Sequence, residues 1–228
     1  MPSGRRIVAD MTEIGEQAKP PFAVLPDPSS LFLSRVERLN ALAPGHHLES
    51  YLEFLATVAR AQHDTLSDLP PASLPPAERI AQTATHGMPP LSRSTLALDG
   101  ATLATVERFL ALLGEASLPE KASDAVSGLR EVLRSSGRET MIAALEDASP
   151  PDDVAQRVLV LAGLQVHLTR FAAMLDASAL QPVANGVCPA CGGAPLASTI
   201  VGWPRAYNPR YCPCGLCGTM WNAIRATC

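Results

Sequence analysis

Two cysteine pairs of the form Cys-x-x-Cys-Gly place the strongest limit on what this chain can fold into. Cys188 and Cys191 form the first pair, and Cys214 and Cys217 form the second. The glycine after each pair tolerates a positive φ, so a tight turn can aim backbone N–H groups at the sulfurs. Two such knuckles supply the four thiolates of a tetrahedral site, which suits Zn²⁺ or a single iron ion. We therefore expect one metal ion, iron or zinc, held by these four cysteines.

Other interpretations of the cysteines fit the sequence less well. A disulfide framework needs an oxidising compartment, and a thioredoxin-like motif uses one pair at the start of a helix. The gap between the knuckles slightly exceeds the common spacing of about fifteen to twenty residues, so a short hairpin must fill it. Cys212 could point the same way as Cys214 on an extended strand, as a spectator or a reserve thiol. Cys228, the last residue, looks like the first cysteine of a further knuckle.

The composition favours helices over sheets in the rest of the chain. Alanine and leucine dominate, and only 4% of the 228 residues are aromatic. We expect a mainly α protein, with an N-terminal helical bundle followed by a small β module of the zinc-ribbon or rubredoxin type. No apolar run reaches the roughly twenty residues of a membrane span, and no apolar region follows Arg5 and Arg6. These features predict a cytoplasmic protein without membrane insertion.

Changes in pattern divide the chain into three expected parts. Residues 1–26 are polar and proline-spotted and are expected to form a flexible lead-in, residues 27–181 a helical domain, and residues 182–228 the metal-binding module. Asp27 is expected to begin a helix as its N-cap, and another helix is expected after Asp99-Gly100. Further helices are expected near 47–66, 77–85, 119–137 and 138–147, and strands near 196–201, 209–212 and 220–225.

Apolar spacing predicts which helix faces are buried. The helix that follows Pro150-Pro151-Asp152 is expected to be the longest and to lie at the centre of the bundle. Its expected stripe includes Gln165 and the apolar side chains Val154, Val158, Leu161, Leu168, Ala172 and Leu175. The other side of this helix is apolar too, at Leu159, Leu164, Val166 and Phe171. For the helix near 47–66, the expected face consists of Leu48, Tyr51, Leu52, Leu55, Val58, Ala59 and Gln62.

The remaining residues suggest no catalytic chemistry. The sequence has no Gly-rich phosphate loop, no nucleophile elbow, and no histidine at ligand spacing from a carboxylate or cysteine. We expect His167 to be a satisfied core residue, His46 and His47 to be solvated or capping, and Trp221 to belong to the core. Residues 182–228 carry three arginines and no acidic residue, so the module with four thiolates and a divalent ion has a charge near +1. That is too little to indicate nucleic-acid binding.

Several of these motifs, taken in order, resemble the FdhE family of formate dehydrogenase accessory proteins. The resemblance covers about residues 25–228. It rests on both knuckles, Arg210-Tyr211, Trp221, Arg225-x-x-Cys228, and the upstream stretches Gly45-His46-x-Leu48-x-x-Tyr51 and Ala61-Gln62.

The resemblance implies a cytoplasmic helper, a chaperone in protein maturation that binds the formate dehydrogenase catalytic subunit and is not itself an enzyme. It also implies a helical domain with two rubredoxin-like modules that bind iron or zinc. The chain departs from the family at Cys212 and in stopping at Cys228, where a third knuckle would begin. We therefore expect a C-terminally truncated member, with Cys228 a possible remnant of a second metal site.

Two other classes of function remain open at this point. One is a zinc-ribbon nucleic-acid-binding or regulatory module, which needs a basic face and salt-dependent binding. The other is a redox enzyme that uses Cys212 as a low-pKa nucleophile. For the accessory protein, Arg205 and Tyr207 are the candidate partner-binding residues, because arginine and tyrosine are frequent interface anchors.

Overall fold

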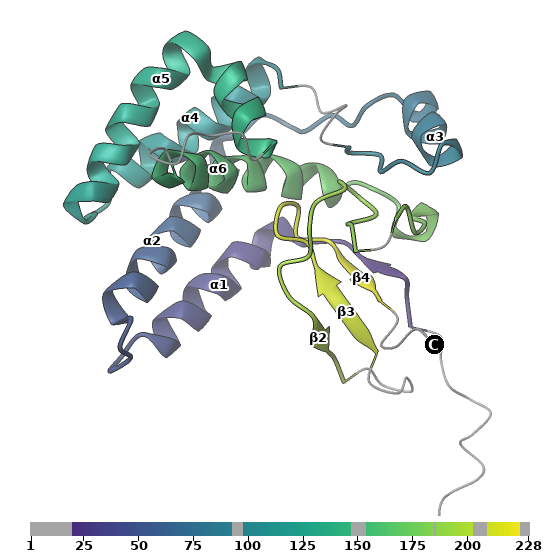
Figure 1. Ribbon diagram of the computed structural model, residues 1–228, viewed down its shortest axis with the longest axis horizontal. Helices are drawn as coiled ribbons and strands as arrows, with labels where there is room; N and C mark the ends of the chain where they lie inside the picture. Colours follow the sequence, from purple (N-terminus) through teal and green to yellow (C-terminus); the bar gives the residue numbers. More distant parts are fainter. Residues whose placement is uncertain (1–19, 93–97, 147–153, 185, 203–208, 224–228) are drawn as a thin grey trace, which may run out of the picture.

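The protein is a helical body with a small antiparallel sheet against one side (Figure 1). The structure, a computed structural model, describes residues 20–92, 98–146, 154–184, 186–202 and 209–223. Its helices are α1 (Pro28–Leu42), α2 (Glu49–Thr65), α3 (Ala77–Thr85), α4 (Gly100–Gly114), α5 (Glu120–Leu145) and α6 (Val154–Ala172), with 3-10 turns at Leu66–Asp68 and Ala177–Ala179. Its strands are β1 (Ala23–Val24), β2 (Thr199–Ile200), β3 (Arg210–Pro213) and β4 (Met220–Asn222). This confirms the expected fold class of a mainly helical chain with a small β module.

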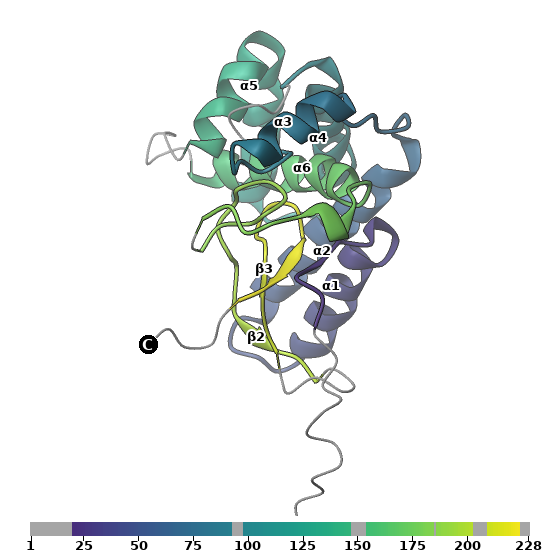
Figure 2. The ribbon, with the colours of Figure 1, turned by 90° about the vertical axis from the view of Figure 1, so that its right-hand side faces the viewer.

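Helix α6 lies at the centre of the molecule, as predicted. In Figures 1 and 2, α4 and α5 lie on one side of α6, and the α1–α2 pair and the sheet lie on the other. The predicted stripe is wrong at its start, because Val154 and Val158 are each 55% exposed. Elements pack against α6 from several directions, so its buried residues do not follow a single stripe: Leu159, Val160, Ala162, Gly163, Leu164, Val166, His167, Leu168, Thr169 and Ala172. Helix α5 spans 26 residues only when both sides of a kink at Ser136 are counted, so α6, with 19 residues, is the longest uninterrupted helix of the described residues, as expected.

The α1–α2 pair begins at the predicted cap and projects from the body. The Asp27 carboxylate accepts a hydrogen bond from the Ser29 backbone N–H at 3.0 Å, which satisfies a free donor of the first turn. The two helices meet at a turn that contains Gly45 at φ 70°. At this tip, Leu48 and Tyr51 are 47% and 55% exposed. Their predicted burial is therefore wrong, because the tip extends beyond the other helices (Figure 1).

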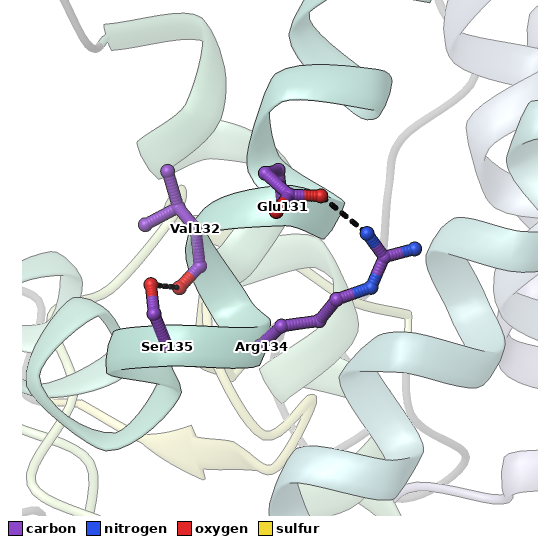
Figure 3. Close-up of polar contacts among 4 residues, drawn as sticks. All are labelled: Glu131, Val132, Arg134 and Ser135. Carbon is purple, nitrogen blue, oxygen red and sulfur yellow. Dashed lines mark hydrogen bonds and ion pairs between the residues drawn. The ribbon is translucent and has the colours of Figure 1, made fainter.

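Helix α5 has a kink at the point where the sequence predicts a break between two helices. Ser136 has a non-helical backbone, with φ −143° and ψ 37°. The carbonyl of Val132 accepts hydrogen bonds from the Ser135 hydroxyl at 3.2 Å and the Ser136 hydroxyl at 3.1 Å. Such side-chain bonds to the preceding turn bend helices. Figure 3 shows the Ser135 contact beside the ion pair of Glu131 and Arg134 on the same helix.

The sheet has the order β1-β4-β3-β2, and every neighbouring pair is antiparallel. Cys212 pairs with Trp221 across β3 and β4, and Ala23 pairs with Trp221 on its other side. The backbone N–H of Asn222 donates to the Phe22 carbonyl at 2.7 Å, next to this pairing. The end of the segment expected to be a flexible lead-in therefore forms an edge strand of the metal-binding module.

One hydrophobic core runs through the helices and the module. It joins Leu110, Leu164 and Leu168 of the helices to Trp221 and to cysteines of both knuckles. The module is consequently packed onto the helical body and shares its core. In the described part of the chain, no helix combines the length and the apolar character that a membrane crossing requires.

Candidate metal centre

Two turns bring the four cysteines of the knuckles to one buried point. Cys188 and Cys191 lie in the loop before β2, while Cys214 and Cys217 lie in the turn between β3 and β4. All four Sγ atoms lie within 4.8 Å of one another. The Sγ atoms of Cys188 and Cys217 are 3.6 Å apart, and those of Cys191 and Cys214 are 3.5 Å apart. Each cysteine is at most 1% exposed.

This arrangement fits a tetrahedral ion. With metal–sulfur distances near 2.3 Å, the sulfurs of a tetrahedral zinc site are about 3.8 Å apart. Two of the observed separations are slightly shorter than that value and none exceeds 4.8 Å, so small movements of the side chains suffice to bind an ion. The four cysteines could therefore hold one metal ion, with every ligand position taken by sulfur.

The glycines and backbone N–H groups of the knuckles have the predicted roles. Gly192 and Gly218, which follow the second cysteine of each knuckle, have φ values of 73° and 77°. The Gly193 N–H donates to Cys191 Sγ at 3.4 Å. The N–H groups of Leu216 and Cys217 donate to Cys214 Sγ at 3.3 and 3.4 Å. Hydrogen bonds of this kind stabilise the ionised sulfur.

The ionisation of the four thiols is strongly interdependent. Contact with the Cys188 thiol, together with contacts to the other thiols, lowers the pKa of Cys214 far below its ordinary value. Contact with Cys188 raises the pKa of both Cys191 and Cys217, and burial adds to this rise. One thiolate therefore forms readily, but its neighbours resist ionisation because negative charges this close repel one another. A bound cation removes that conflict, since it attracts all four thiolates.

Two close neighbours of the sulfurs were not foreseen from the sequence. A Cβ atom on Gly193 would lie 3.0 Å from Cys214 Sγ, so this position has room only for glycine unless the sulfur moves. Thr219 is completely buried. Its hydroxyl lies 3.3 Å from Cys217 Sγ, and its backbone carbonyl accepts a hydrogen bond from the Cys214 N–H at 2.8 Å. The only local signals in the sequence that could have indicated these two neighbours are the pairs that directly follow the knuckles, Gly192-Gly193 and Gly218-Thr219.

Of the other cysteines, only Cys212 lies in the described part of the chain, and it does not join the four sulfurs. Cys212 is 8% exposed on β3 and lies outside the cluster. Cys228, Arg205 and Tyr207 lie outside the described residues, so their predicted roles stay predictions. Trp221 is 6% exposed and packs in the core, as expected. Among the described residues, no second group of three or more potential ligands lies close enough to hold a metal.

The histidines have structural positions, as predicted. His167 is 3% exposed, with its Nε2 atom 3.3 Å from the Thr102 hydroxyl and its Nδ1 atom 3.4 Å from the Thr105 hydroxyl. Burial, helped by the positive Arg170, lowers the pKa of His167 to about 4. His46 is exposed, and its Nδ1 atom accepts the Leu48 N–H at 3.1 Å near the start of α2.

Comparison with known proteins places this geometry in a family. The model of the FdhE N-terminal domain matches residues 20–185, and the model of the FdhE central domain matches residues 187–225. The chain is 35% identical over 219 residues to a protein FdhE homolog from Rhizobium meliloti, covering 96% of this chain and 72% of that relative. It is 36% identical to a homolog from Stutzerimonas stutzeri, covering 92% of this chain and 69% of that relative.

A solved structure agrees with these relationships. The crystal structure of the FdhE protein from Pseudomonas aeruginosa superposes with a TM-score of 0.74 and 31% identity, covering 92% of this chain and 72% of that chain. Two family models thus match nearly all of the described residues, and the knuckles lie within the central-domain match. The chain belongs to the FdhE family.

Proposed function

We propose that this protein is an accessory factor for the maturation of formate dehydrogenase, which binds the catalytic subunit of that enzyme in the cytoplasm through protein–protein contacts. The observation that carries the proposal is the family match across residues 20–225, which includes the four-cysteine centre. The resemblance of the sequence motifs to formate dehydrogenase accessory proteins supplies the identity of the enzyme.

The closed metal centre supports a role without catalysis. A catalytic zinc site keeps one position open for water or substrate, whereas a site with four protein ligands stabilises structure. Here four buried sulfurs lie close enough together that they would fill all the positions of a tetrahedral ion. We propose that one iron or zinc ion fixes the fold of the module in this way, and that the protein is not an enzyme.

The charge of the module argues against the competing nucleic-acid function. Within residues 186–202 and 209–223, Arg210 is the only charged side chain apart from the cysteines. Even with Arg205 and Arg225, four thiolates and a divalent ion leave the module near +1. Nucleic-acid-binding domains have a clustered basic face, because neutralising phosphates supplies most of their affinity.

The test is association with the catalytic subunit of formate dehydrogenase. We expect the purified protein to retain the tagged subunit in a pull-down, and a strain without the gene to lose formate oxidation. Expression of the wild-type chain should restore the activity, and a Cys188→Ser variant should restore less. Normal formate oxidation in the deletion strain, together with no detectable association, would refute the proposal.

A further inference from the structure

The side chain of Gln165 connects the second knuckle to three helices. Its Nε2 atom donates a hydrogen bond to the Gly215 carbonyl at 2.9 Å. Its Oε1 atom accepts from Gln62 Nε2 at 2.9 Å and from Arg35 Nη1 at 3.3 Å. Gln165 belongs to α6, Gln62 to α2 and Arg35 to α1. One amide group therefore links the metal-binding turn to the α1–α2 pair.

The partners of Gln165 are themselves held in place. Gln62 is 3% exposed, and its Nε2 atom also donates to the Ala162 carbonyl of α6 at 2.8 Å. The Arg35 guanidinium lies over the Phe32 ring, 5.3 Å from its centroid. The buried Gln62 amide thus donates to two acceptors on α6, and the half-buried Gln165 amide has both its donor and its acceptor group paired, which favours a single arrangement because an unpaired polar group away from water is costly.

Gly215 lies inside the second knuckle, between the ligands Cys214 and Cys217. Its carbonyl orientation depends on the turn that the ion would hold closed. Gln165 contacts no sulfur, so any effect on the ion passes through this turn. Partners outside the coordination sphere commonly orient the ligands of a metal site and strengthen binding.

We propose that Gln165 is a positioning residue that couples metal binding in the second knuckle to the packing of α1 and α2 against α6. Binding of the ion fixes the Gly215 carbonyl, which holds the Gln165 amide in the orientation that Gln62 and Arg35 require. Thermodynamic linkage makes the effect reciprocal, so breaking the contact must weaken metal binding as well. The inference rests on the metal centre of the proposed function, but it does not depend on formate dehydrogenase.

Two substitutions separate the donor and acceptor roles of the amide. Gln165→Glu keeps an acceptor for Gln62 and Arg35 but removes the donor to Gly215. Gln165→Leu removes both. We expect each variant to bind Zn²⁺ about tenfold more weakly than the wild type in competition with a chelator, since one lost hydrogen bond leaves a carbonyl unpaired. Gln156→Glu is the matched control, because Gln156 lies on the same helix beside Gly128 of α5.

Hydrogen exchange reports the coupling directly. In the wild type, removal of Zn²⁺ should raise amide exchange several-fold in α1 and α2, around Val36 and Ala61, as well as in the module. In Gln165→Glu, α1 and α2 should stay protected with or without the ion. In Gln165→Leu, they should exchange faster in both states. A residue with a purely structural role would give the same response to Zn²⁺ removal in every variant.

The outcomes distinguish this inference from the proposed function. Far-UV circular dichroism of each Zn²⁺-loaded variant first verifies that the helices are formed. A wild-type chain whose exchange rises only in the module, or variants that bind Zn²⁺ within twofold of the wild type, would overturn the inference and leave the proposed function intact. A wild-type chain that binds neither zinc nor iron would instead refute the metal centre itself.

Discussion

Replacement of His167 by glutamine tests whether burial keeps this histidine neutral in the folded protein. The imidazole is 3% exposed, and its two nitrogens lie 3.3 and 3.4 Å from the hydroxyls of Thr102 and Thr105. Its ring centroid lies 4.5 Å from that of Phe171. A charged imidazolium would have to leave water and lie near the positive Arg170, so the pKa of His167 falls from 6.5 to about 4.

The size and sign of the effect follow from these two pKa values. They differ by about 2.5, and each pKa unit corresponds to about 1.4 kcal/mol, so at a pH below both values the free energy of unfolding is lower by about 3 kcal/mol. A depressed histidine pKa means that the unfolded chain binds a proton which the folded chain does not. The free energy of unfolding is therefore unaffected well above pH 6.5, falls as the pH drops below 6.5, and reaches its full loss below about pH 4. Between about pH 8 and pH 5, the loss from His167 is about 2 kcal/mol.

Urea unfolding, followed by far-UV circular dichroism, measures this loss. Wild type and His167→Gln are compared at about pH 8 and pH 5, so that acid effects on other groups cancel in the difference. We expect the variant to be about 1–2 kcal/mol less stable at the higher pH, because it loses ring packing, and this gap to close or invert at the lower pH. His47→Gln is the control, since His47 is exposed at the tip of the α1–α2 pair.

The reasoning fails if His167→Gln loses as much free energy of unfolding between the two pH values as the wild type does. In that case the imidazole would be accessible to protons in the folded state. Thr102 and Thr105 would then be stabilising a charged ring, and the packing of α4 on α6 would be looser than the structure shows.

Five further substitutions test the packing and the metal centre. Cys188→Ser should lower bound metal from one ion per chain to near zero by elemental analysis, while most of the helical circular dichroism signal remains. Gly218→Ala should lower the free energy of unfolding, measured in urea, by about 2–4 kcal/mol, because φ is 77° and the new Cβ would lie 2.8 Å from Leu31 Cδ2. Gly45→Ala, where φ is 70° but the new Cβ would meet no other atom, should lower it by about 1 kcal/mol. Gly163→Ala should cost about 2 kcal/mol, because its Cβ would lie 3.1 Å from the Val106 backbone. Gly128→Ala, which has room, should instead stabilise α5 by up to about 1 kcal/mol.

Features that depend on neighbouring residues were predictable from the sequence. The cap at Asp27 formed as expected, because a side-chain oxygen reaches the N–H groups two or three residues later whatever the tertiary structure, and Asp99 caps the helix expected after it in the same way. The positive φ of Gly192 and Gly218 follows in the same way from the geometry of the knuckles. Local spacing also suffices to bring the two thiols of each pair together.

Several features that depend on distant residues were not predictable, although the meeting of the two knuckles was. Strand β1 has two residues, too few to show an alternating pattern, and its partner β4 lies near the other end of the chain. The face of α6 was misjudged at Val154 and Val158, since a helix packed from several directions has no single apolar stripe. Gln165 was placed in the stripe, but nothing in its neighbours indicated a contact with Gly215.

The positions of these long-range contacts explain how a closed metal site could serve a binding protein. The second knuckle connects β3 to β4, and β4 pairs with β1, which leads directly into α1. At the end of the same knuckle, Gly218 leaves space for Leu31 of α1, while Gly215 is held by Gln165 of α6. An ion that fixes this turn therefore fixes the start of α1 and the junction with α6. In the proposed function, such an ion would contribute to the shape that a partner protein meets, which a site without an open ligand position can provide.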